Sequence, residues 1–310
     1  MYDLISDGFL VPQKQFQSLN DLIIAEDLPE HYLSFVERFF RPIAQAISSS
    51  SDCFILAIQG SQGSGKSTCA KFLKSILETD FSLRTVVLSI DDFYFTKAER
   101  EALGRSIHPL LRSRGVPGTH DVTLALETLA ALKDLKEGGE LWLPRFDKAV
   151  DDRLPKSAWD KVRGKVDLVI FEGWCVALEP ESEEALVSPI NDLEKEEDSD
   201  GRWRSYVNEQ LAGVYQDLFA QFDKLLVLEA PSFDCVYAWR LEQEQKMIAQ
   251  LKARGLDSSK AFTATEIRRF VSYFERLSRH SFKTLTKRAD FCLKLDKDHN
   301  FTEASGACFY

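Results

Sequence analysis

The residues best suited to chemistry lie in one glycine-rich stretch, which runs from Gly60 to Ser67 and reads Gly-Ser-Gln-Gly-Ser-Gly-Lys-Ser. It matches the pattern G-x-x-x-x-G-K-[ST] and lies between the apolar run 54–58 and a helical pattern over 67–77, the context that this motif requires. Glycine allows backbone turns that are closed to other residues, so consecutive N–H groups can converge on phosphate oxygens at the start of a helix. The stretch therefore predicts a phosphate-binding P-loop.

The predicted P-loop supplies a set of nucleotide-binding residues. Lys66 is expected to reach the β- and γ-phosphates, and the hydroxyl of Ser67 to bind Mg²⁺. The alternative, a Gly/Ser-rich turn that matches the motif by chance, is disfavoured by the strand before it and the helix after it. The residues expected to bind ATP are Gly60, Ser61, Gln62, Gly63, Ser64, Gly65, Lys66, Ser67 and Thr68.

Acidic residues follow two further strand patterns. The β-branched run 85–90 ends in Asp91 and Asp92, and the apolar run 166–171 is followed by Glu172. Open α/β sheets bind ligands at the carboxyl ends of their parallel strands. A carboxylate at Glu172 suits the second motif of P-loop folds, which helps to hold Mg²⁺ directly or through water. The alternative role of Glu172 is to cap the next turn.

Two polar segments lie between these strands. Residues 114–121 have the composition of turns, and Asp121 is expected to cap a helix over 122–136. Residues 141–153 are irregular and rich in both charges. We expect both segments to form polar connections.

The other patterns alternate strand with helix. Apolar runs predict strands at 224–229 and 291–295, and helical periodicity predicts helices at 203–222, 232–254 and 263–287. This alternation predicts an α/β fold of the P-loop NTPase type, with a doubly wound, mostly parallel sheet and helices on both faces.

The chain is expected to consist of an N-terminal helical extension, residues 1–50, and a P-loop domain, residues 51–310. Apolar residues at helical spacing predict a helix within 28–47, followed by the serine-rich linker 48–52. Residues 179–202 are acidic and polar, so we expect a solvated, mobile insertion loop there.

The composition is typical of a soluble globular protein, with 44% apolar and 28% charged residues in 310. No apolar run approaches the ~20 residues needed to span a bilayer, and the first residues lack the basic start of a secretory signal. We therefore expect a cytoplasmic protein that does not bind membranes. The net charge of −10 argues against nucleic-acid binding. The six cysteines are scattered, so we expect reduced thiols and no zinc.

The P-loop alone does not distinguish GTPases, motor ATPases and small-molecule kinases. The guanine motif N-K-x-D of GTPases is missing from the sequence. Motor ATPases usually have an apolar run that ends in Asp-Glu, whereas Phe171 is followed here by Glu172, Gly173 and Trp174. These features favour phosphoryl transfer to a small molecule.

Five segments in one order resemble the D-glycerate 3-kinase family of plants, yeasts and bacteria. This family belongs to the P-loop kinases, which include uridine kinase, phosphoribulokinase and bacterial pantothenate kinase. The resemblance covers roughly residues 50 to 300 and implies an additional helical lid at about 232–256. The segments are Ser89–Tyr94, Arg114–Asp121, Pro144–Lys148, Phe171–Trp174 and Trp239–Glu244.

The resemblance implies roles for two groups of side chains. Asp91 is expected to accept the proton of the substrate hydroxyl, because Phe93 sets the register of the family's Asp-x-Phe segment; Asp92 is the competing candidate. Arg240 lies in the lid, where an arginine stabilises charge on the transferred group, unless it belongs to a solvated helix face. Trp174 and Trp239 are expected to be packing residues.

The resemblance also implies a pocket for a small anion, for which arginine forks are well suited. Each arginine has an alternative role in a surface ion pair. The residues expected to contact the substrate are Asp92, Tyr94, Arg114, His120, Asp121, Arg145, Asp147, Lys148 and Arg153.

The implied activity is Mg²⁺-dependent transfer of the ATP γ-phosphoryl group to a hydroxyl of D-glycerate. One alternative is a related kinase of another metabolite, such as a nucleoside or pantothenate. The other is a nucleotide-binding regulatory protein without an acceptor. Asp91, Glu172 and Arg240 count against the regulatory protein, because nucleotide binding alone needs no base.

Overall fold

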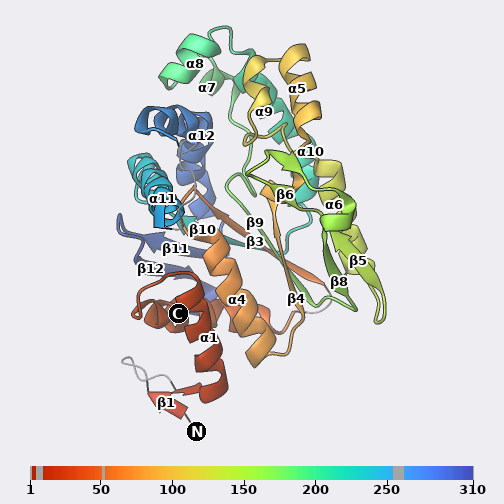
Figure 1. Ribbon diagram of the computed structural model, residues 1–310, viewed down its shortest axis with the longest axis vertical. Helices are drawn as coiled ribbons and strands as arrows, with labels where there is room; N and C mark the ends of the chain where they lie inside the picture. Colours follow the sequence, from red (N-terminus) through yellow and green to blue (C-terminus); the bar gives the residue numbers. More distant parts are fainter. Residues whose placement is uncertain (1, 5–9, 51–52, 254–261, 310) are drawn as a thin grey trace.

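The computed structural model describes residues 2–4, 10–50, 53–253 and 262–309. A six-stranded sheet runs through the middle of the molecule (Figure 1). Its strands are β3 (Phe54–Gly60), β4 (Thr85–Ser89), β9 (Leu168–Gly173), β10 (Lys224–Glu229), β11 (Phe291–Leu295) and β12 (Phe301–Gly306).

The strand order is β12-β11-β10-β3-β9-β4, and all neighbours are parallel except β11 and β12. The predicted α/β fold with a mostly parallel sheet is confirmed. The sequence patterns predicted no strand after residues 291–295, but β12 pairs with β11 at the edge of the sheet. Asp296 makes this return possible, because its side chain accepts the N–H groups of Asp298 and Asn300 in the connecting turn.

Helices cover both faces of the sheet because the central strand is apolar on both sides. Ile55 and Ala57 point into one core, and Leu56 and Ile58 into the other. The first core is covered by α6 (Val122–Asp134), α9 (Arg202–Ala212), α10 (Val214–Phe219) and α12 (Ala264–Thr284). The predicted helix 203–222 is thus two helices, divided at Gly213.

The second core contains α4 (Lys66–Asp80) and the N-terminal helices. These helices are α1 (Gln13–Ala25), α2 (Tyr32–Phe35), a π-helical turn (Val36–Phe40) and α3 (Arg41–Ile47). The last three account for the helix predicted within 28–47. A short antiparallel ribbon, β1 (Tyr2–Leu4) with β2 (Leu10–Pro12), precedes them. The N-terminal segment therefore shares a core with the sheet.

The segment 179–202, predicted as a solvated loop, is exposed at most of its residues but has secondary structure and buried anchor points. The segment contains α7 (Glu183–Leu186) and α8 (Asp192–Glu197), and both Glu194 and Asp198 are 0% exposed. Arg276 of α12 donates to the two carboxylate oxygens of Glu194 at 2.7 Å each, and Arg204 of α9 pairs with Asp198 at 2.9 Å. These guanidinium groups neutralise the acids and fix the segment against the domain.

Smaller elements surround the carboxyl edge of the sheet. Antiparallel pairs form between β5 (Glu140–Leu143) and β8 (Asp160–Arg163) and between β6 (Phe146–Asp147) and β7 (Asp152–Arg153), so the segment 141–153 is more regular than expected. The helix α5 (Lys97–Ser106) follows the end of β4.

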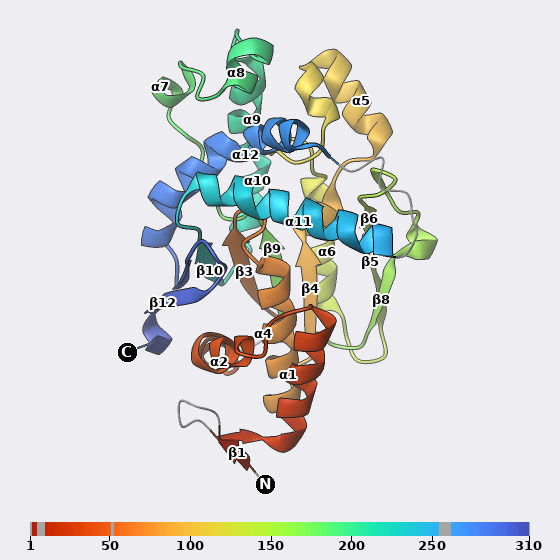
Figure 2. The same cartoon turned by 60° about the vertical axis from the view of Figure 1, so that its left-hand side comes forward.

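The long helix α11 (Phe233–Ala253) runs across the molecule near the upper end of β3 in the view of Figure 2. Residues 254–256, the end of the expected lid, lie outside the described residues, as do residues 51 and 52 of the expected linker. Among the described residues, no helix is both long enough and apolar enough to cross a membrane.

Candidate active site

The P-loop connects β3 to α4, as predicted from the motif. Gly63 and Gly65 have φ of +80° and +86°, in the left-handed region that favours glycine. A Cβ atom on Gly63 would lie 2.7 Å from Cβ of Trp239, so Gly63 also allows α11 to approach the loop. A Cβ atom on Gly60 would lie 2.5 Å from Oγ of Ser64, so the loop closes tightly on its first residue.

The loop presents polar atoms that fit a polyphosphate. Oγ of Ser61, Oε1 of Gln62 and Oγ of Ser64 are buried and have no hydrogen-bond partner among the described residues. Lys66 donates from Nζ to the Ser61 carbonyl oxygen at 2.9 Å, and burial lowers the pKa of this ammonium group. A set of buried polar groups without partners, beside a cation and a helix start, fits a bound anion.

Ser67 and Glu172 form a pair of oxygen ligands next to the P-loop. The register of β3 and β9 places Glu172 opposite Ile58, just before the loop. The Ser67 hydroxyl donates to Oε1 of Glu172 at 3.0 Å. Burial raises the pKa of Glu172, against the opposing effect of Lys66. Hydroxyl and carboxylate oxygens are the ligands that Mg²⁺ prefers, so these two residues fit a Mg²⁺ site.

Asp91 and Asp92 occupy a 3₁₀ turn after β4 and point to different surroundings. Asp91 accepts from Tyr94 Oη at 2.9 Å and from Lys148 Nζ at 2.6 Å. Asp92 instead accepts from Arg145 at 2.7 Å. Burial alone would raise the pKa of Asp91, but Lys148 outweighs it and the pKa is lowered, whereas burial raises the pKa of Asp92.

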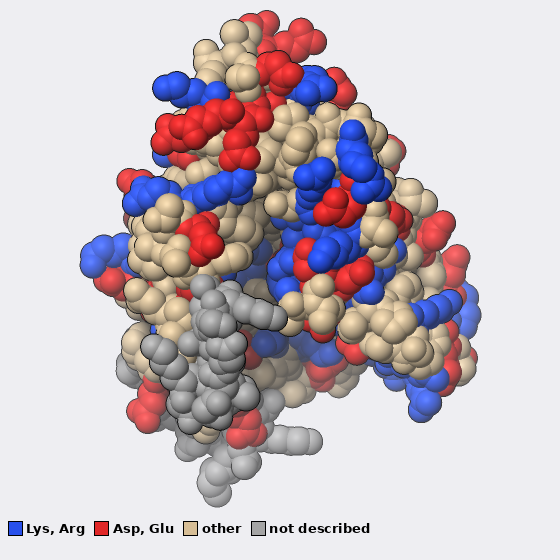
Figure 3. Space-filling view, turned by 45° about the horizontal axis from the view of Figure 1, so that its top comes forward, with Lys and Arg blue, Asp and Glu red and all other residues tan. Residues whose placement is uncertain are grey.

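These groups meet in one cavity of about 440 Å³. Figure 3 shows charged side chains of both signs gathered around a hollow in the middle of one face. The lining consists of Gln62, Gly63, Lys66, Ser67, Asp91, Tyr94, Arg114, Lys148, Glu172, Gly173, Trp174, Arg240, Gln243, Glu244, Phe270 and Phe274. The residues predicted to bind phosphate, to hold Mg²⁺ and to act as the base therefore line a single space.

Three of the predicted substrate residues line this cavity: Tyr94, Arg114 and Lys148. Arg114 is paired with Asp151, and its guanidinium lies 5.6 Å from the centre of the Phe146 ring. The side chain of Lys148 is 61% exposed. Arg114 and Lys148 are thus cations that an incoming anion can reach.

The other six predicted substrate residues lie behind the lining. Arg153 donates to the Tyr94 carbonyl oxygen and pairs with Asp121 at 3.2 Å. Asp121 also caps α6, as predicted, by accepting the N–H of Leu124. Arg145 bridges Asp92 and Asp160. These contacts hold the lining in place.

His120 and Asp147 complete this supporting layer. The ring of His120 stacks on Tyr94 with 4.4 Å between ring centres, and Nδ1 lies 2.7 Å from Oη of Tyr215. Burial lowers the pKa of His120 to about 4. Asp147 accepts the N–H of Ala149 within its own turn. His120 therefore supports Tyr94 as a neutral ring.

The helix α11, in the region predicted to form a lid, contributes three side chains at helical spacing: Arg240, Gln243 and Glu244. The guanidinium of Arg240 pairs with Glu244 at 2.6 Å. The helix is anchored by Trp239, whose Nε1 donates to the Lys297 carbonyl oxygen at 2.8 Å. Spacing from Arg240 could have indicated Gln243 and Glu244 as site residues.

Two aromatic residues of α12, Phe270 and Phe274, also line the cavity. Phe274 packs edge-on against Trp174, whose Nε1 donates to the Gly115 carbonyl oxygen. Both tryptophans are buried packing residues, as expected. No local pattern distinguished Phe270 and Phe274 from other apolar positions of their helix.

A second cavity of about 370 Å³ lies on the other side of Gly63. Gly63 and Gln243 line both cavities, so the two spaces meet at the P-loop. The second cavity is also lined by Thr68, and Thr68 donates to Glu26 of the segment after α1 at 3.4 Å. His299, which stacks on Trp239 at 4.4 Å, forms another part of the wall. The N-terminal segment is thus part of the P-loop surroundings.

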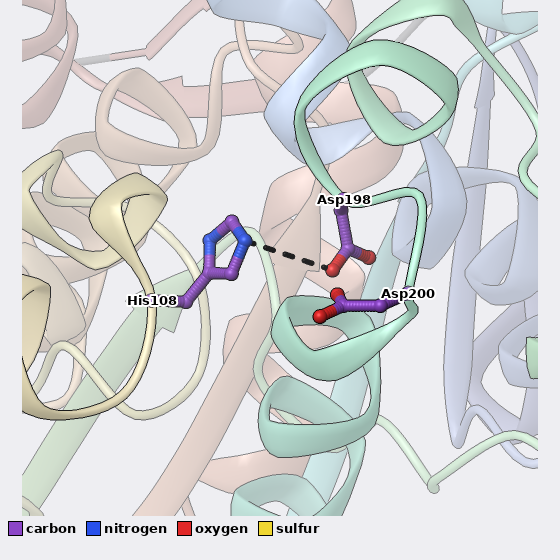
Figure 4. Close-up of side chains that lie close together, drawn as sticks. All are labelled: His108, Asp198 and Asp200. Atoms are coloured by element: carbon purple, nitrogen blue, oxygen red, sulfur yellow. Dashed lines mark ion pairs between the residues drawn. The ribbon is translucent and has the colours of Figure 1, made fainter.

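A group of potential metal ligands, His108, Asp198 and Asp200, lies outside both cavities (Figure 4). Nδ1 of His108 accepts the N–H of Leu110, so Nε2 carries the proton and has no lone pair for a metal. Asp198 already accepts from the guanidinium of Arg204. The contacts of this group are therefore structural.

Known proteins resemble the chain over most of its length. The "uncharacterized kinase mug58" of Schizosaccharomyces pombe is 33% identical over 289 residues, which cover 89% of this chain and 96% of that protein. The chloroplastic D-glycerate 3-kinase of Arabidopsis thaliana is 30% identical over 228 residues, covering 71% of this chain and 46% of the plant protein. No protein-family model matches the chain.

A solved structure, the D-glycerate 3-kinase of Cryptococcus neoformans var. grubii serotype A, superimposes with a TM-score of 0.67. It is 24% identical, and the match covers 89% of this chain and 99% of that one. The two chains share a fold.

Proposed function

Because the chain belongs to the D-glycerate 3-kinase family of P-loop kinases, we propose that it transfers the γ-phosphoryl group of ATP to a hydroxyl of D-glycerate. Membership makes it an ATP- and Mg²⁺-dependent phosphotransferase that acts on a small molecule. One observation carries the choice of acceptor: two reachable cations, Arg114 and Lys148, border Asp91 in the same cavity as the P-loop.

The P-loop residues hold the nucleotide. Bound Mg·ATP supplies the phosphoryl group and a divalent cation that offsets its negative charge. Lys66 binds the phosphates together with the backbone of the loop, and Ser67 and Glu172 hold the metal. The nucleoside part lies in the second cavity, which continues from the P-loop at Gly63 and Gln243.

Asp91 acts as the base, and this choice rests on its position. It lines the cavity, whereas Asp92 is held by Arg145 behind it. Asp91 is kept ionised by Lys148 and orients the acceptor hydroxyl, whose proton it takes late in the transfer. Asp92 is therefore a positioning residue for the turn.

The acceptor carboxylate binds to Arg114 and Lys148. A guanidinium supplies fixed, paired donors for a carboxylate, and an ammonium supplies a flexible charge. Lys148 is shared between Asp91 and the acceptor, so binding of the anion brings the hydroxyl next to the base. Arg240 offsets charge on the transferred group from the opposite, lid side of the cavity.

Two further proposals concern the whole chain. Residues 51–310 form the kinase domain with its lid in α11, and residues 1–50 form an N-terminal extension that completes the nucleotide side. We also propose that the protein is located in the cytoplasm, where a kinase of a small metabolite has access to ATP.

The test is ADP release from Mg·ATP with D-glycerate, L-glycerate, uridine, pantothenate or no acceptor. We expect release that depends on D-glycerate. Release with uridine or pantothenate would instead identify a related metabolite kinase. Nucleotide binding without release with any acceptor would identify a regulatory protein, which contradicts the proposal.

A further inference from the structure

Three carboxylates line the catalytic cavity: Asp91, Glu172 and Glu244. The proposed reaction uses the first as base and the second as metal ligand, and it gives no role to Glu244. A third carboxylate facing a phosphate site adds repulsion unless a cation is fixed to it. We propose that Glu244 is a positioning residue that holds the guanidinium of Arg240 toward the transferred phosphoryl group. The inference rests on the proposed function of the same cavity.

Both oxygens of Glu244 are used, and they point to different elements. Oε2 lies 2.6 Å from NH2 of Arg240, one helical turn away on α11. Oε1 accepts the N–H of Phe262 at 2.8 Å, just before α12 begins. Glu244 is 3% exposed. The carboxylate therefore cannot turn away from Arg240 without losing its hydrogen bond to the backbone of Phe262.

Aromatic rings limit the other movements of the guanidinium. Its central carbon lies 5.7 Å from the ring centre of Phe270 and 6.0 Å from that of Phe262. Planar guanidinium groups stack favourably on such rings. Phe270 also lines the cavity. Carboxylate and rings together fix an otherwise flexible side chain in the direction that catalysis needs.

The neighbouring helix α12 provides a control pair. Glu275 and Arg279 are four residues apart, like Arg240 and Glu244, and lie 2.8 Å apart, with side chains 14% and 50% exposed. Neither residue lines the catalytic cavity or the second cavity. The substitution Glu275→Gln therefore removes one charge of such a pair without changing the surroundings of Arg240.

The experiment is a double-mutant cycle on ADP release with Glu244→Gln and Arg240→Ala. Glutamine keeps an oxygen for the N–H of Phe262 but no charge for Arg240. We expect Glu244→Gln to lower kcat by about 10- to 100-fold, since misplacing a catalytic group has this cost. KM for ATP should change less than kcat, and Glu275→Gln should behave as the wild type.

The decisive result is the double variant. If Glu244 acts through Arg240, the double variant has the same kcat as Arg240→Ala alone. Independent, multiplied losses would overturn the proposal, as would a normal kcat in Glu244→Gln. If Glu244→Gln does not fold, Glu244→Asp, which withdraws the carboxylate by one methylene, takes its place in the cycle with the same criterion.

The acceptor assignment can fail separately. Each variant is assayed with D-glycerate and, in a parallel series, with water as the acceptor. Wild-type protein whose ADP release does not increase when D-glycerate is added would contradict the proposed acceptor, and the cycle would still be read from water-dependent release. If the wild type is active with D-glycerate but the kcat losses of Glu244→Gln and Arg240→Ala multiply in the double variant, only the role of Glu244 is contradicted.

Discussion

Two of the buried arginine–carboxylate contacts among the described residues are built differently. The first, which we call the junction, joins Arg276 of α12 to the segment 179–202. Arg276 donates there to both oxygens of Glu194 and to the carbonyl oxygens of Ala185 and Ser188. In the catalytic cavity, Glu244 is the only carboxylate paired with Arg240 among the described residues. The junction lies in a packed interior, and the cavity faces open space.

The difference separates charges that stabilise from charges that react. A guanidinium whose donors are used by main-chain oxygens cannot exchange partners without unfolding its surroundings. Lys148, which is 61% exposed and holds Asp91, can exchange its partner for an incoming anion. The junction should therefore determine stability, and the cavity should determine turnover.

The largest expected effect is that of Arg240→Ala on turnover. An arginine that offsets charge on a transferred phosphoryl group contributes about 10³-fold or more to kcat. We expect a loss of this size in ADP release, with a smaller fall in the melting temperature than that of Arg276→Ala, because Arg240 is 19% exposed and Arg276 is 8% exposed. A normal kcat with a lowered melting temperature would place Arg240 with the junction arginines.

The converse variant is Arg276→Ala. Removing one partner of a buried pair leaves Glu194 uncompensated, and we expect the free energy of unfolding to fall by about 3 kcal/mol or more. Urea denaturation measures this change, and kcat per folded molecule should stay within about twofold. Arg279→Ala on the same helix is the control, because its contact with Glu275 is half exposed. Equal stability of the two variants would contradict the distinction.

A smaller effect is expected for Asp91→Asn. The amide keeps the shape of the side chain but cannot take a proton, so kcat should fall by about 10²-fold while ATP still binds. Steady-state kinetics and nucleotide titration measure the two quantities. Asp92→Asn is the comparison, and a larger loss there than at Asp91 would exchange their roles.

The smallest expected effect is the pH dependence of stability that comes from His120, behind the cavity lining. Burial lowers the pKa of His120 to about 4, whereas an unfolded histidine titrates near about 6.5. Folding thus favours the neutral ring. Its contribution to stability is complete above about pH 6.5 and is lost as the pH falls toward 4.

Between pH 7 and pH 5, this linkage should cost about 1 to 2 kcal/mol of stability. Urea denaturation of the wild type and His120→Gln at both pH values measures it. The loss should be smaller in His120→Gln by this amount. An identical pH dependence in both proteins would show that His120 titrates normally.

Local patterns were sufficient for the elements whose partners follow in sequence. The P-loop context, the predicted strands at 224–229 and 291–295, and the cap at Asp121 all depend on residues within a few positions of each other, and each is present. The strand ends also brought Asp91 and Glu172 to one edge of the sheet, because parallel strands share a direction.

Long-range partners explain what the patterns did not show. The burial of Glu194 depends on Arg276, which is far away in sequence, so the acidic composition of 179–202 suggested a solvated loop. Phe270 and Phe274 line the cavity because α12 crosses near α11, and no motif marks that crossing. Six of the nine predicted substrate residues support the lining because charge and position in sequence do not define the direction of a side chain.

Phe301 in β12 is the point where distant parts of the chain meet. Its ring lies 5.2 Å from that of Phe40 and 6.2 Å from that of Tyr32. A ribosome makes the N-terminal helices long before β12, so their aromatic side chains lack this partner during most of synthesis. Glu26 and His31 of the same segment line the second cavity. The second cavity therefore acquires its outer wall only after translation has reached β12.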